Sequence, residues 1–152
     1  MSAPFLLGGA VFEIQKQPAD PTRLKIPVAD SAGAAVAVLN EISHALLGAG
    51  YAVKEPKRCS PNFARLKCRL SRESDIEIVL VDEGNSGQIE RFCLMSMAFV
   101  DKTDTGIRRR VEEQWQELAA HFDSAVAARY AVVSILHLSP EETAERDAAS
   151  PR

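Results

Sequence analysis

The segment that decides the fold is residues 62–100, which read NFARLKCRLSRESDIEIVLVDEGNSGQIERFCLMSMAFV. Polar and apolar residues alternate through most of it with the two-residue period of half-buried strands. Charged and glycine-rich turn residues interrupt this alternation twice. The pattern therefore predicts three successive antiparallel strands, over residues 63–70, 75–82 and 89–100.

The first two of these strands can be aligned by their faces. A slip of one residue would turn every side chain to the opposite side of the sheet, so apolar residues must meet apolar residues. Leu70 opposite Ile76 meets this condition, with residues 71–75 as the loop. The same alignment places Arg69 opposite Glu77, a cross-strand pair worth about 0.2–1 kcal/mol.

The third strand is apolar on both faces, which distinguishes it from its neighbours. If Phe92 and Leu94 join the core, the opposite face of the sheet carries an outer apolar patch made of Val79, Val81, Cys93, Met95, Met97 and Phe99. A basic row on the first strand flanks it at Arg65, Lys67 and Arg69. A sheet face in contact with water does not normally carry such a patch. We therefore expect another part of this chain, a second copy or a partner protein to cover it.

The N-terminal region predicts two more strands, over residues 10–16 and 23–28. Pro27 cannot donate a hydrogen bond to a ladder, so the second of them is expected at a sheet edge. Residues 17–22 between them are turn-forming. The two strands are expected to form a hairpin, which is one candidate cover for the outer apolar patch.

Two helices are predicted from the spacing of apolar residues. The first begins at Asp30 or Ser31, either of which is a favourable N-cap, and runs to about Leu47. The second spans residues 106–128, where apolar residues recur in steps of three and four. Residues 101–105 supply candidate caps for it.

The remaining elements are short. Residues 51–54 and 130–138 predict strands. Ser139 and Glu142 resemble a capping box, with proline at the first helical position between them. Residues 143–152 are polar and are expected to form a flexible C-terminal tail.

The order of these elements predicts an α+β fold: a mostly antiparallel sheet with two main helices packed on one face, as a two-layer sandwich. The length of 152 residues suits one domain, which we assign to residues 1–142, followed by the tail at 143–152.

Composition limits the function classes. The net charge of −3 argues against a general nucleic-acid binder, whose affinity comes from neutralising phosphates. Cys59, Cys68 and Cys93 form an odd set without a disulfide framework, which favours reduced thiols and a cytoplasmic location. The N-terminus lacks the basic region of a signal peptide, and no apolar run is long enough to span a membrane.

No catalytic, metal or nucleotide motif has the spacing that its chemistry requires. The candidate reactive side chains are Cys59 and the three histidines, His44, His121 and His137, and no His/Cys pair has zinc-ligand spacing. We expect no catalytic residue, metal ion or cofactor, and we favour a protein that is not an enzyme.

The leading hypothesis is a non-catalytic protein-interaction module, which binds itself as a homodimer or binds a protein partner through the outer apolar patch, with the basic row steering an acidic partner. The alternative is a small-molecule or nucleotide-binding protein, with or without enzymatic activity. Its pocket would lie between helices and sheet, lined by His44, His121 or Cys59, with anion contacts from residues 108–110. A local nucleic-acid contact through the basic residues is a third, weaker hypothesis.

Overall fold

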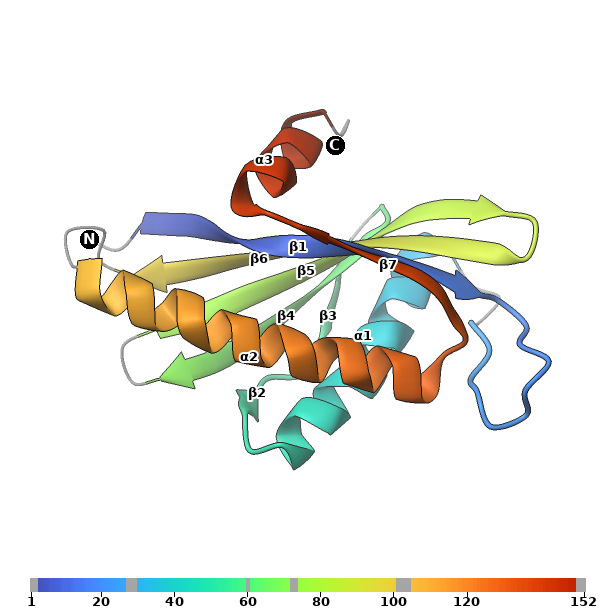
Figure 1. The fold of residues 1–152 in the computed structure, drawn as a ribbon. Coiled ribbons are helices and arrows are strands. Elements are labelled where there is room, and N and C mark those ends of the chain that lie inside the picture. Colours follow the sequence, from blue (N-terminus) through green and yellow to red (C-terminus); the bar gives the residue numbers. More distant parts are fainter. Residues whose placement is uncertain (1–2, 27–29, 60, 72–73, 101–104, 150–152) are drawn as a thin grey trace.

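The computed structural model describes residues 3–26, 30–59, 61–71, 74–100 and 105–149. Within these ranges the chain forms seven strands and three helices (Figure 1). In chain order the elements are β1 (Ala3–Gln15), α1 (Ser31–Gly48), β2 (Ala52–Val53), β3 (Lys57–Cys59), β4 (Phe63–Ser71), β5 (Ser74–Ser86), β6 (Ile89–Val100), α2 (Thr105–Arg129), β7 (Val132–Leu138) and α3 (Pro140–Ala149).

The strands form one antiparallel sheet in the order β2-β4-β5-β6-β1-β7, with β3 also paired to β4. Figure 1 shows α1 and α2 on one face of this sheet and α3 on the other. The predicted α+β fold is confirmed.

The main core lies between the sheet and the two long helices. The inward face of β4 and β5 is the predicted one, with Leu66, Ile76 and Ile78 fully buried. From α1, Leu39 and Ile42 reach this core, as the apolar spacing of that helix requires. α2 adds a second row of side chains, Val111, Trp115, Leu118, Phe122 and Val126.

β1 is an interior strand of the sheet, and the predicted N-terminal hairpin is wrong. β6 pairs along one side of β1 and β7 along the other, so neither side is free for residues 23–28. Residues 23–26 form no strand, although the Ile26 amide donates to the Lys16 carbonyl at 3.0 Å. Residues 27 and 28 lie outside the described ranges.

A β-bulge in β1 changes which residues of this strand face the core. The ladder with β6 shifts between Leu6 and Gly8, where Gly8 has a φ of +141°. Phe5 before the shift and Ala10 after it are therefore both buried on the core side. Without the bulge, one half of this 13-residue strand would turn its apolar residues outward.

The predicted register between β4 and β5 is wrong by two residues. Cys68 pairs with Ile76, and Arg69 pairs with Asp75 and not with Glu77. Ser71 pairs with Ser74, so the turn is shorter than the expected loop over residues 71–75. A shift of two residues leaves every side chain on its predicted face, and for this reason the face pattern could not detect the error.

The second turn of this meander is also tighter than the sequence suggests. β5 continues to Ser86 and β6 starts at Ile89, so Gly87, with a φ of +63°, lies at the turn. A bulge between Asp82 and Gly84 lets β5 continue through residues that were expected to form a loop.

Both predicted helices are confirmed. α1 begins after Asp30, whose carboxylate accepts a hydrogen bond from the Gly33 amide at 2.8 Å and also contacts Arg58. α2 begins at Thr105. Of the expected caps for this second helix, those at 101–104 lie outside the described ranges.

The chain forms a third helix, α3, where the sequence predicts a capping box followed by a polar tail. The capping box is confirmed: the Glu142 amide donates to the Ser139 hydroxyl, and the Ser139 amide donates to the Glu142 carboxylate, both at 3.1 Å. Thr143 is fully buried and anchors this helix on the sheet. Residues 150–152 lie outside the described ranges.

Candidate functional site

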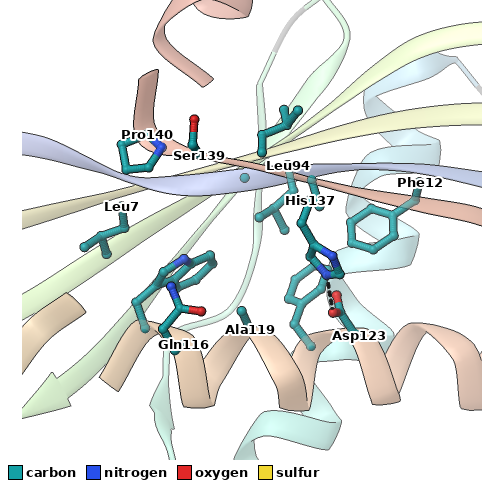
Figure 2. A pocket seen from close by; sticks show the side chains of 14 residues that line it. Leu7, Phe12, Leu94, Gln116, Ala119, Asp123, His137, Ser139 and Pro140 are labelled. Carbon is teal, nitrogen blue, oxygen red and sulfur yellow. Dashed lines mark hydrogen bonds and ion pairs between the residues drawn. The ribbon is translucent and has the colours of Figure 1, made fainter. Parts of the chain in front are cut away.

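A cavity of about 230 Å³ lies between α2 and the corner where β7 leaves the sheet (Figure 2). β7 pairs with β1 from Gly9 onward, so the earlier half of β1 has no strand on this side. Ala10 from the sheet and Ala119 from α2 each contribute only a methyl group here. Small residues on facing elements thus leave space that larger side chains surround.

The walls of the cavity are mostly apolar and well packed. Phe12 and Phe122 stack with ring centroids 5.6 Å apart, and both are buried. Trp115 and Leu94 belong to the same buried core and also line the cavity. Side chains held in this way form a rigid surface, as in pockets that exist before a ligand binds.

A histidine–carboxylate pair lies at the mouth of the cavity. His137 Nε2 lies 2.6 Å from Asp123 Oδ2, and the side chains are 64% and 27% exposed. Figure 2 shows His137 extending from the sheet toward Asp123 on the helix. Gln116 and Ser139 add further polar groups to the lining. Convergent polar groups beside an apolar wall can orient a bound molecule.

The charge of the lining is also distinctive. Among the described residues that line the cavity, Asp123 is the one carboxylate, and none is lysine or arginine. The cavity therefore suits a neutral or cationic molecule better than a phosphorylated one.

The residues that sequence reasoning placed in a pocket do not line this cavity. His121 makes an edge contact with Tyr51, with ring centroids 5.7 Å apart. The Arg108 guanidinium lies 4.4 Å from the centroid of the Phe5 ring and pairs with Glu112. The anion contacts expected from residues 108–110 therefore do not converge on the cavity.

The candidate pair that the sequence alone does not indicate is His137 with Asp123. These residues are 14 positions apart, one on a strand and one on a helix, so no local spacing joins them. The available signal was weak: His137 interrupts the otherwise uncharged strand VVSILHL.

The outer apolar patch lies on the sheet face opposite α1 and α2, as the alternation requires. Its central members, Val79, Cys93 and Met95, are already buried and pack with Val11 from β1. Val81 and Met97 are half-buried, and Phe99 is 36% exposed. The accessible part of the patch is therefore smaller than the sequence suggested.

Part of this outer face is covered by α3. The Arg146 guanidinium bonds Glu83 on β5 at 2.5 Å and also interacts with the Cys93 thiol. Thr143 approaches Gly9, since a Cβ atom built at that glycine would lie 3.3 Å from its Oγ1 atom. Neither β1 nor β7 covers this face, because both are strands of the same sheet.

The basic row beside the patch has acidic neighbours within the sheet. Arg65 lies 3.8 Å from Glu77, and Arg69 lies 3.0 Å from Asp75. Lys67 is directly opposite Glu77 in the ladder. These pairs offset much of the positive charge that was expected to steer an acidic partner.

Among the residues that the structure describes, no group of three or more His, Cys, Asp and Glu side chains is placed to hold a metal ion. In the same part of the chain, no helix combines the length and apolar character needed to cross a membrane. Comparison with protein-family models, curated proteins and solved structures returned no match.

Proposed function

We propose that this protein binds a small, mainly apolar molecule in the cavity between α2 and the β1–β7 corner. The observation that supports this proposal is the cavity itself, with rigid aromatic walls and a polar pair at one end. This arrangement is the usual form of a small-molecule site.

The proposed ligand carries a flat apolar body and one cationic or hydrogen-bond-donating group. Trp115 and Phe122 offer aromatic surface to the body. Asp123 is a carboxylate with acceptor positions beyond the single bond it makes to His137. A ligand amine placed at the mouth would gain a charge-assisted hydrogen bond there.

The protein contains a natural spectroscopic probe of ligand binding in the cavity. It has one tryptophan, Trp115, which lines the cavity. Its fluorescence and its indole N–H resonance in NMR spectra therefore report on the cavity without ambiguity. A fragment set of matched aromatic amines, neutral analogues and carboxylates would be titrated against the protein. We expect amines or neutral fragments to shift the indole resonance at concentrations where the carboxylates do not.

Two alanines on α2 provide a matched pair of variants. Ala119→Leu adds three carbons inside the cavity, whereas Ala120→Leu adds them on the exposed side of the same helix. Ala119→Leu should abolish fragment binding, and Ala120→Leu should retain it. Fragments that bind both variants equally, or a complete set that fails to shift the Trp115 resonance, would contradict the proposal.

A third variant tests the ligand's charge. Asp123→Asn keeps the shape of the side chain and removes its charge. If the carboxylate selects a cation, this variant should lose the preference for amines over neutral analogues while still binding the neutral fragments. An unchanged preference would exclude Asp123 as the selecting group.

Protein interaction through the outer apolar patch is a second candidate. It is favoured by the exposure of Phe99 beside the half-buried Met97 at one end of β6. The double variant Met97→Asp with Phe99→Asp tests it, because substitution of the buried Met95 would disturb folding as well. A protein that is retained by the wild type and lost by this folded variant would support the second candidate. Equal retention by both would remove it.

A further inference from the structure

The two edges of the sheet differ in how they are protected from pairing with another strand. At one edge lie β2, with two residues, and β3, with three, and β3 carries Lys57 and Arg58. Very short strands and lysine or arginine side chains are the usual means of keeping an edge unpaired. Helix α1 also contacts both of these strands.

The opposite edge, β7, is longer and uncharged, and its irregularity is a single bulge at Val133. Its seven residues, VVSILHL, include no lysine, arginine, aspartate, glutamate or proline. Val133 and Leu136 are 55% and 60% exposed, the two largest such values among the described large hydrophobic residues. An edge strand of this length and composition is a strong template for pairing with another strand.

We propose that β7 pairs antiparallel with β7 of a second copy of this chain about a twofold axis, which joins two sheets into one. This inference goes beyond the proposed ligand binding and does not depend on it. Main-chain hydrogen bonds between the two edge strands would supply the contact, and Leu136 would be buried beside the other copy.

The composition of β7 favours a second copy as the occupant. In a twofold antiparallel pair, each strand faces an identical strand from the other copy. A charged residue near the axis would therefore lie close to the same charge on the other copy. β7 has no permanently charged residue and avoids this repulsion. An axis at Leu136 pairs the regular part of the strand beyond the bulge at Val133, with Ser134 of one copy opposite Leu138 of the other, and keeps each of these side chains on its own face.

The contrast between the edges also predicts where assembly stops. Within the described ranges each chain is open along one edge of the sheet, formed by β7 and the first half of β1, while the edge at β2 and β3 is short and basic. Pairing through β7 uses that open edge in both copies. The expected product is a closed dimer and not a fibre or a larger ring.

Sedimentation of the full chain, measured across a concentration series, tests the proposal with two matched variants. Leu136→Lys introduces a charge into β7 and should convert the dimer to a folded monomer. Leu47→Lys makes the same change at a residue on α1 that is 51% exposed, and it should leave the dimer intact. Circular dichroism would confirm that both variants are folded.

Hydrogen exchange of the wild-type chain supplies a second measurement that needs no variant. Amides of residues 134–138 should become more protected as concentration rises through the dimerisation range, and those of residues 52–59 should not. A chain that stays monomeric at every concentration, a dimer that persists in Leu136→Lys, or an assembly larger than two would each overturn the proposal. A monomeric chain would indicate that the β7 edge is available to pair with an extended segment of another protein and not with a second copy.

Discussion

Replacing Gly9 with alanine should destabilise the protein strongly, although alanine is the better residue for most strand positions. Gly9 lies in the middle of β1, between β6 and β7. A Cβ atom at this position would lie 2.1 Å from the Leu94 carbonyl oxygen and 3.3 Å from Thr143 Oγ1. The first contact is with backbone of the adjacent central strand, so no side-chain rotation can relieve it.

The size of the effect follows from this overlap. The Leu94 oxygen must move by roughly 0.9 Å to reach even the 3.0 Å limit that Cβ contacts observe. Forced overpacking of this kind costs about 1–3 kcal/mol, and we expect the upper end because two paired strands must separate. In a chain of this length each kcal/mol lowers the melting temperature by about 2–4 °C. The expected loss is therefore about 6–12 °C.

Thermal and urea unfolding followed by circular dichroism would measure this change. Gly48→Ala is the matched control, because no atom lies within 4 Å of the Cβ position at that helical glycine. It should stabilise the protein by up to about 1 kcal/mol, since alanine is favoured over glycine in helices. A melting temperature of Gly9→Ala within about 2 °C of the wild type would correspond to a loss of stability of no more than about 1 kcal/mol. Such a result would refute the close approach of β1 and β6.

Three further predictions concern a helix cap, the thiols and pH. Ser139→Ala removes the capping box of α3 and should cost about 0.5–2 kcal/mol, with faster hydrogen exchange confined to that helix. Burial raises the pKa of the Cys68 thiol to about 11, and Cys93 is buried as well. The native protein should therefore react quickly with a thiol reagent at the half-exposed Cys59 alone. The unfolded protein should react at all three cysteines. The amide of Gly33, followed by Arg58, lowers the pKa of Asp30 below its ordinary value of 3.8. Because the folded pKa is the lower one, this stabilisation is complete above pH 3.8 and is lost as the pH falls through the folded value. The difference in melting temperature between wild type and Asp30→Ala should therefore shrink in acid, and a constant difference would count against the cap.

Local features of the sequence determined much of the secondary structure. The alternation in residues 62–100 placed three strands and the correct face of each, because side chains on a strand alternate with a fixed period. The apolar spacing in residues 106–128 placed α2 almost to the residue. The capping box at Ser139 was likewise visible, since its two partners are only three residues apart.

Tertiary structure decided the features that depend on which distant segments meet. Nothing local shows that β1 is an interior strand, because its neighbours β6 and β7 come from the far end of the chain. The register of β4 on β5 was open for a related reason, since a shift of two residues preserves every face. The cavity could not be predicted from local patterns, because its small and aromatic residues are spread over β1, β6, α2 and β7. Only tertiary packing brings His137 to Asp123. Periodicity specifies which face of an element is buried, whereas the identity of its neighbour depends on the free energy of the whole packed chain.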